Sequence, residues 1–144
     1  MNNSLLIPIA VVALIGLVWW YRRSRQNDRM DLVMAQHKGT ATICSRAQLI
    51  DGANHIDVAL MLEQQQINYQ NNDIDLDATL DIAQIDEVEY GSDLVNGGTP
   101  DGRVLRLRAH GRAIEFVLDA ASAAQWALKL PPHRMNESGA VHAV

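Results

Sequence analysis

The aspartates in residues 73–77 have the spacing that comes nearest to a metal-binding motif in this chain. Carboxylate oxygens at alternate positions suit a hard cation, and D-x-D-x-D matches the start of a calcium loop. The rest of the motif is missing, because Ala78 stands where a sharp-turn glycine is needed and Gln84 where a bidentate glutamate is needed. We therefore interpret these aspartates as the solvent-facing side of a strand.

Other residues suited to catalysis or metal binding lack partners at a useful spacing. The five histidines show no metal-ligand spacing, so we interpret them as solvated or turn residues. Cys44 is the single cysteine, which excludes an internal disulfide, and its place in a predicted strand favours a small core residue over a nucleophile. The sequence also has no phosphate loop and no nucleophile elbow. We expect no enzymatic activity, no cofactor and no metal site.

Four arginines form the main basic cluster of the chain after its N-terminal region: Arg103, Arg106, Arg108 and Arg112. In a β-hairpin Arg106 and Arg108 share a strand face, and with Arg112 they could bind a phosphate or an acidic partner segment. We favour local ion pairing, because Glu115 is expected opposite Arg106 and exposed charges commonly pair with neighbours. The acidic residues between positions 81 and 93 are interpreted as a solvated face, or else as a docking surface for a basic partner.

An uncharged apolar run, LLIPIAVVALIGLVWWY, occupies residues 5–21. A helix over this run is about 25 Å long, near the short end for crossing a hydrocarbon core. Aromatic residues close the run and arginines follow at once, as at a membrane–water interface. The residues expected at this interface are Trp19, Trp20, Tyr21, Arg22, Arg23 and Arg25. We expect an uncleaved single-pass transmembrane helix.

Two other readings of this run are a cleaved signal peptide and a buried helix of a soluble protein. A signal peptide needs a positive charge before the apolar run and small residues after it, and both are missing here.

The arginines follow the run and none precedes it, so the positive-inside rule predicts an outside N-terminus. We expect the cell (inner or plasma) membrane as the location, with the C-terminal domain in the cytoplasm.

The remaining residues suit one small domain with an acidic surface. The chain has 144 residues, 48% of them hydrophobic, and a formal net charge of −5. Residues 1–30 carry four arginines and one aspartate, a net charge of +3, so the net charge of residues 31–144 is −8. This charge argues against a nucleic-acid partner, which needs a basic surface.

Alternation of apolar and polar residues predicts mainly β-structure between residues 38 and 118. We expect a first strand at 40–44, an alternating strand pattern at 58–63 that Ile67 and Tyr69 continue, a further strand at 73–77, and a surface loop at 96–102. The most definite element is a hairpin with His110-Gly111 as its two-residue turn. That register places Arg106 opposite Glu115 and apolar residues opposite each other on the other face.

A helix is expected after this hairpin. Asp119 is a favourable N-cap, and residues 120–130 (AASAAQWALKL) are strong helix formers with Trp126 on one apolar face. Two prolines at 131–132 stop the helix, and residues 133–144 are expected to be a flexible tail.

Short strands followed by one amphipathic helix with a central Trp resemble a pleckstrin-homology (PH)-like domain, specifically the GRAM-like and bacterial PH-like members. The matching segments are residues 58–70, 78–91 and 103–130. The resemblance implies a partly open β-barrel capped by the C-terminal helix, with Trp126 filling its mouth. The family binds phosphoinositides through a basic cluster on the strands and loop that open the barrel. In this chain the corresponding residues 40–63 contain one basic residue, Arg46, so head-group binding there is not expected.

We therefore expect a mainly β protein with α-helices, organised in four parts: a transmembrane anchor at 1–21, a basic and polar juxtamembrane linker at 22–37, a PH-like domain at 38–132 and the tail at 133–144. The predicted function is a membrane-anchored cytosolic adaptor or scaffold that recruits a protein partner not identified by the sequence. The alternative is a lipid or small-ligand sensor that uses the basic strand cluster.

Overall fold

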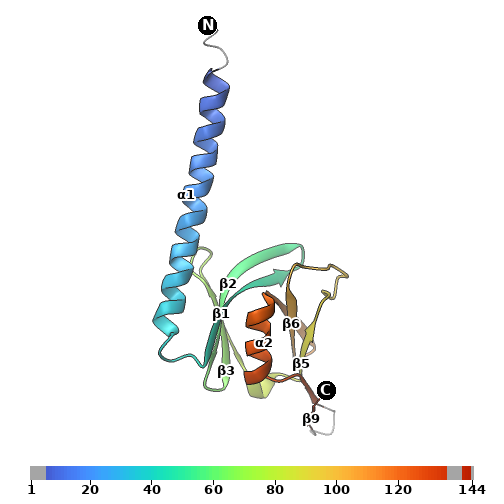
Figure 1. Cartoon of the computed structure of the whole chain (residues 1–144). Helices are drawn as coiled ribbons and strands as arrows, with labels where there is room; N and C mark the ends of the chain where they lie inside the picture. The colour runs from blue at the N-terminus through green and yellow to red at the C-terminus, as the bar shows by residue number, and fades with distance from the viewer. Residues whose placement is uncertain (1–5, 136–140, 144) are drawn as a thin grey trace.

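A computed structural model of the chain describes residues 6–135 and 141–143, with side chains over residues 9–135 (Figure 1). The helices in this part are α1 (Leu6–His37), α2 (Ala120–Lys129) and the short 3₁₀ helix η2 (Ile82–Gln84). The strands are β1 (Ile43–Asp51), β2 (Asn54–Glu63), β3 (Gln66–Asn71), β4 (Leu76–Asp81), β5 (Glu87–Gly91), β6 (Arg103–Ala109), β7 (Arg112–Leu118), β8 (His133–Met135) and β9 (Val141–Ala143).

The strands form one antiparallel sheet with the order β4-β3-β2-β1-β7-β6-β5-β8-β9. Two meanders, β1–β4 and β5–β7, are joined where β7 pairs with β1. The sheet is open, because β4 and β9 stand at its two ends. The mainly β class, the N-terminal helix and the C-terminal helix are therefore confirmed.

The β6–β7 hairpin has the register that the sequence predicts. Its pairs run from Arg103 opposite Leu118 to Ala109 opposite Arg112. His110 and Gly111 have φ angles of 52° and 74°, so both turn residues are left-handed, as a two-residue turn matched to the strand twist requires.

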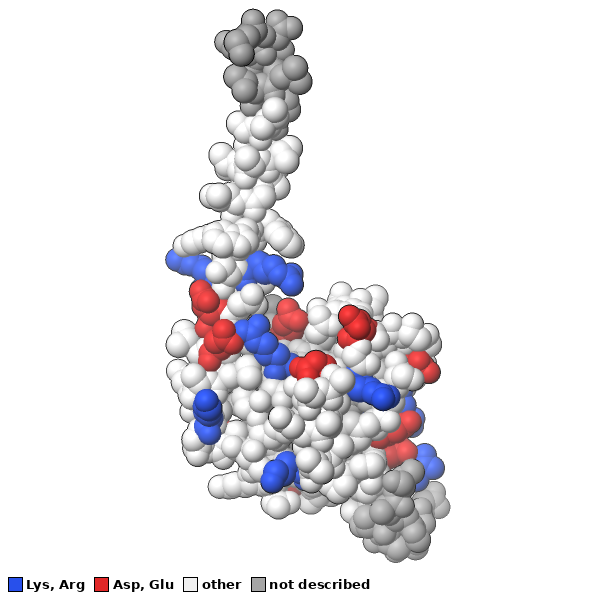
Figure 2. All heavy atoms as spheres, in the orientation of Figure 1, with Lys and Arg blue, Asp and Glu red and all other residues white. Residues whose placement is uncertain are grey.

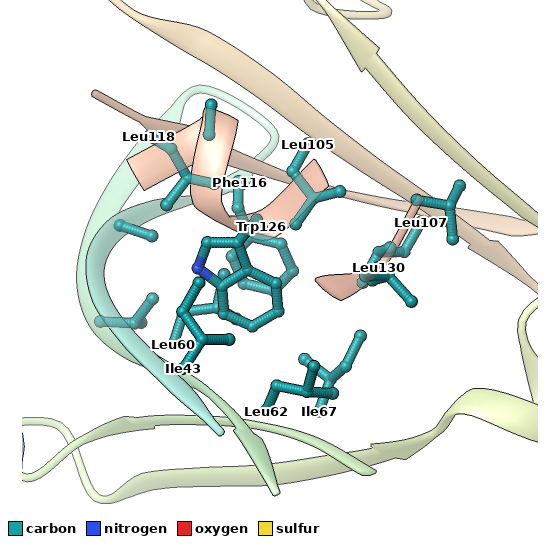
Figure 3. Packing of buried hydrophobic residues seen from close by; sticks show 14 of the residues in the cluster. Ile43, Leu60, Leu62, Ile67, Leu105, Leu107, Phe116, Leu118, Trp126 and Leu130 are labelled. Carbon is teal, nitrogen blue, oxygen red and sulfur yellow. The ribbon is translucent and has the colours of Figure 1, made fainter. Parts of the chain in front are cut away.

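The inner face of the curved sheet surrounds the main core, into which α2 inserts (Figure 3). Asp119 caps α2 by accepting a hydrogen bond from the Ser122 N–H at 2.8 Å, as expected. Trp126 is fully buried, and Figure 3 shows its ring between residues of β1, β2, β6 and β7. The core residues labelled there are Ile43, Leu60, Leu62, Ile67, Leu105, Leu107, Phe116, Leu118, Trp126 and Leu130.

The N-terminal helix is longer than expected, because α1 runs without a break through residues 22–37, the predicted linker. Its first half projects away from the sheet (Figure 1), and the apolar side chains described between residues 9 and 21 are exposed. Within the described part of the chain, no helix has both the length and the apolar character needed to cross a membrane. Leu5, the first residue of the predicted apolar run, lies outside the described residues.

The second half of α1 packs on the outer face of β1 and β2. Val33 is buried against Ala59 and Met61, with Met30 and Met34 beside it. Spacings of three and four residues place these side chains on one helix face. The helix therefore covers the second face of β2, and residues 58–62 are buried on both faces.

Three further boundaries differ from the sequence-based expectation. The first strand begins at Ile43 and extends to Asp51, beyond the predicted 40–44. Residues 73–75 form a turn, with Asp75 at φ 54°, and β4 begins only at Leu76. Residues 133–135, predicted as part of a flexible tail, form strand β8 beside β5, while residues 136–140 and 144 lie outside the described residues.

Candidate functional site

Aromatic side chains are followed directly by arginines where α1 leaves the sheet domain. The Arg23 guanidinium lies 5.6 Å from the Trp19 ring centre, and that of Arg25 lies 5.0 Å from the Tyr21 ring centre. Such cation–π pairs are expected where an apolar helix meets a polar interface. Figure 2 shows arginine and lysine atoms in blue at the base of the projecting helix, where the helix reaches the sheet domain.

Polar contacts at three levels fix α1 against the sheet domain. Arg29 forms an ion pair with Asp73 in the β3–β4 turn, with 2.7 Å between Nη1 and Oδ1. On either side of Arg29 in the helix, Asn27 and Asp31 bind the guanidinium of Arg46 in β1. Together with the Val33 contact, these pairs hold the second half of α1 against the sheet domain.

Glu63, at the end of β2, makes the third contact with α1, at the C-terminal end of the helix. Its Oε1 lies 2.7 Å from Nδ1 of His37 and accepts a hydrogen bond from the Thr40 hydroxyl at 3.0 Å, while Oε2 accepts from the Asn68 amide at 3.2 Å. The hydrogen bond with His37 is the main reason that the pKa of Glu63 is lowered from its ordinary value. His37 was interpreted as a solvated residue, and nothing in the local sequence pairs it with a glutamate 26 positions away.

A hollow of about 570 Å³ lies between α1 and the edge of β2. Its wall includes basic groups on Arg23 and Arg46 together with acidic groups on Asp57 and Asp73. Arg46 and Asp73 are already engaged by α1 residues. The hollow therefore has mixed charge, and we assign no ligand to it.

The predicted basic cluster on β6 and β7 is divided between the two sheet faces. Arg106 and Arg108 lie at alternate positions on the outer face, whereas Arg103 and Arg112 have the register parity of the inner face. Arg106 is largely buried and donates to Glu115 at 2.9 Å, to Glu89 at 2.8 Å and to the Asp93 carbonyl at 2.9 Å. The cluster therefore does not form a single four-arginine surface.

The charge on Arg106 is stabilised by its neighbours. Burial acts to lower the pKa of the guanidinium, but the hydrogen bonds to Glu115 and Glu89 outweigh it and raise that pKa. Arg108 is half-exposed and lies 3.2 Å from Glu87. The local pairing that we favoured for these two arginines is present.

Trp126 is held by a polar contact as well as by packing. Its Nε1–H donates to the hydroxyl of Ser45 in β1 at 3.1 Å. Both groups are buried, so the indole N–H has the partner that a buried tryptophan needs. The residue predicted to cap the barrel thus ties α2 to the first strand.

The free edge of β5 is occupied by the chain itself. β8 pairs with this edge, with Arg134 opposite Glu87 and His133 opposite Val88, and the Met135 N–H donates to the Asp86 carbonyl at 2.7 Å. The Arg134 guanidinium lies 2.8 Å from Glu87. Within the described residues, this short strand extends the sheet beyond β5, and the Arg134–Glu87 ion pair joins the two strands.

Two of the three aspartates in residues 73–77 are engaged by other side chains. Asp73 is engaged by Arg29, and Asp77 accepts a hydrogen bond from the Gln70 amide at 3.2 Å. Across the residues that the structure describes, no three His, Cys, Asp or Glu side chains gather as metal ligands would.

Comparison with known proteins found no matching family model, no matching curated protein and no matching solved structure. The fold and its contacts define a class in general terms: a small open-sheet domain with a long helix whose second half packs on the sheet.

Proposed function

We propose that this chain is a single-pass membrane protein whose cytosolic, PH-like domain recruits a protein partner at the inner face of the cell membrane. The observation that carries the proposal is α1, one 32-residue helix whose second half belongs to the domain while its apolar first half is exposed. A contiguous exposed apolar surface of this kind marks contact with a membrane or another protein.

Membrane attachment is the use of this surface that agrees best with the charges. In the sequence the apolar run extends from residue 5 to 21, and Arg22, Arg23 and Arg25 follow it. Arginines beside a membrane are retained on the cytoplasmic side. The acidic body then stands below an anionic leaflet that repels it, at a distance held by the docked half of α1.

The PH-like assignment is supported by the strand order and by α2. A four-strand and a three-strand meander meet at β1 and β7, the sheet is open because β4 and β9 stand at its two ends, and the Trp126 helix fills the interior. These features agree with a partly open barrel capped by a C-terminal helix. Such a scaffold binds partners without chemistry of its own, and the proposed role is not enzymatic.

A protein partner is favoured over a lipid or small ligand. A lipid sensor would use the basic strand cluster, but Arg106 and Arg108 are paired with glutamates and Arg103 and Arg112 belong to the other face. We therefore keep the sensor as the second candidate function and place it below the adaptor.

Two experiments test the proposal. Alkaline carbonate extraction of cell membranes should leave the full-length chain in the membrane pellet, and a C-terminal reporter should be active in the cytoplasm. Release into the soluble fraction would overturn the anchoring part of the proposal.

Proximity labelling with the full-length chain should then identify a protein that is not labelled by a control chain ending at residue 37. This control keeps α1 whole and removes the sheet. Equal labelling by both chains would overturn the adaptor role, and binding of anionic liposomes by the full chain that is lost at high salt would favour the sensor.

A further inference from the structure

We propose that the β5 edge is the partner-binding site, that β8 is an exchangeable strand which occupies it in the free protein, and that the partner supplies an extended segment with an arginine or lysine facing Glu87. This inference rests on the adaptor role proposed above and specifies how that role is performed. Addition of an extended peptide to a sheet edge is an established mode of recognition, in which main-chain hydrogen bonds give affinity and side-chain contacts give selectivity.

The first argument is that β8 itself shows which sequence the edge accepts. Arg134 and Glu87 are directly opposed, and the Arg134 Nε and Nη2 atoms lie 3.0 Å and 2.8 Å from the same carboxylate oxygen. β8 is thus an internal copy of the ligand that we propose. An incoming strand with a basic residue at this position would reproduce the pair.

The second argument is that β8 is weakly held. Only two of its three residues pair with β5, its other edge pairs with β9, and Arg134 and Met135 are exposed. Pro131 and Pro132 precede it, and a proline has no N–H with which to continue the ladder toward Tyr90 and Gly91. A partner segment without prolines could pair along all of β5 and would therefore compete with β8.

The third argument is that release of β8 leaves no unpaired buried charge. Glu87 is contacted on its other side by Arg108, at 3.2 Å in the next strand, so the carboxylate keeps a cation when Arg134 leaves. β5 also keeps its full pairing with β6, from Glu87 to Gly91. The edge can therefore change its occupant while the rest of the domain stays folded.

The test uses a fluorescent peptide, Thr-Val-Thr-His-Arg-Met, whose last three residues copy β8 and whose first three replace the segment before it without proline. Its affinity is measured for the full-length chain in detergent and for a chain ending at residue 132. We expect the shortened chain to bind at least about tenfold more tightly, because the part of the edge opposite Glu87 and Val88 is vacant. Equal affinity for the two chains, or no binding to either, would overturn the proposal.

A second variant retains the whole chain, so that release of β8 is separated from any effect of its removal on folding. Arg134→Glu places two carboxylates opposite each other and should release β8, which raises peptide affinity in the same direction. Unchanged affinity in this variant, with an unchanged circular dichroism spectrum, would count against an exchangeable strand.

Charge selectivity is tested with a matched pair of variants in the shortened chain. Glu87→Gln should abolish the preference for the peptide over a control peptide in which Glu replaces Arg. Asp101→Asn removes the same charge from an exposed loop residue away from this edge and should leave the preference intact. Loss of the preference in both variants would indicate attraction by overall charge and would overturn the specific site.

Failure of this inference can be distinguished from failure of the adaptor role. If proximity labelling finds a domain-dependent partner whose labelling is the same with Arg134→Glu and with wild type, the adaptor role stands and the β5 site is wrong. If the peptide binds as expected but no domain-dependent partner is labelled, the β5 site stands and the adaptor role is wrong.

Discussion

The indole N–H of Trp126 donates to the hydroxyl of Ser45 at 3.1 Å, across 81 residues of sequence and inside the core. This one bond links the capping helix α2 to β1, the strand at which the two meanders meet. The bond fixes the orientation of the Trp126 ring, a large apolar group that could otherwise fill the interior in several ways.

The first prediction concerns this bond. Ser45→Ala leaves the buried Trp126 N–H without a partner and should lower the free energy of unfolding by about 1–3 kcal/mol. Denaturant titration of the full-length chain in detergent, followed by tryptophan fluorescence, measures this loss. Ser92→Ala, in an exposed loop, is the control and should have little effect. Equal stabilities of the two variants would show that the bond contributes nothing.

The second prediction concerns Gly102, just before β6. Its φ is 139°, and an added Cβ would lie 2.4 Å from the backbone oxygen of Leu118. Gly102→Ala should therefore cost more than about 2 kcal/mol in unfolding free energy, through backbone strain and a clash that a side-chain movement cannot relieve. At Gly39, where a Cβ meets no atom within 4 Å and no positive φ is required, the same substitution should be nearly neutral. A thermal shift that is the same for both variants would contradict the prediction.

The third prediction concerns the docked half of α1. Val33→Ala removes buried methyl groups from the contact with Ala59 and Met61 and should cost about 1–2 kcal/mol. Leu32→Ala, one residue earlier, removes a side chain that is 62% exposed and should be close to neutral. Hydrogen exchange should show faster opening of residues 30–37 in Val33→Ala alone. Similar exchange in both variants would mean that this half of α1 is a linker, as first expected.

The fourth prediction is a dependence of stability on pH. The pKa of Glu63 is lowered, chiefly by its hydrogen bond with His37, so ionised Glu63 stabilises the folded state. This contribution is fully present above the ordinary glutamate pKa of about 4.3 and is lost as the pH falls through the lower folded-state value. Unfolding free energies measured between pH 6 and acid conditions should fall less steeply in Glu63→Gln than in wild type. Asp101→Asn, an exposed loop carboxylate, should leave the slope unchanged.

The fifth prediction separates the two central arginines of β6. Arg106→Ala leaves the buried Glu115 without its main partner and should cost about 3 kcal/mol or more. Arg108→Ala removes a half-exposed guanidinium and should cost less than about 1 kcal/mol. If both substitutions were well tolerated and both abolished liposome binding, the arginines would be ligand-binding groups and the sensor function would be favoured.

The elements with local signals were predictable. The β6–β7 hairpin follows from a turn of two residues and from the alternation on each side of it, so every pair in its register could be written down. The same holds for α2, whose N-cap, apolar face and proline stop all lie within residues 119–132. These features depend on neighbours in sequence, which act whatever the rest of the fold does.

Contacts between distant elements were not predictable. The apolar face of α1 at Met30 and Val33 is short enough to read as a polar linker, and its function is apparent only when β2 presents Met61 to it. In the same way, β8 becomes a strand because β5 offers an unpaired edge. A segment of three residues is too short for its own pattern to predict a strand. In each case the segment itself has only a weak preference for one conformation. The contact that the fold provides determines which conformation it adopts.

The sequence by itself determined the apolar run with its arginines, the β-rich acidic body, the hairpin register and the capping helix, because each is encoded by periodicity or turn chemistry within a short segment. The tertiary structure alone decided that the second half of α1 is docked, that the four arginines divide between two faces, that His37 binds Glu63, and that the chain's own Arg134 occupies the β5 edge. These are pairings between residues far apart in sequence, and their energies exist only after the sheet has brought the groups within contact distance.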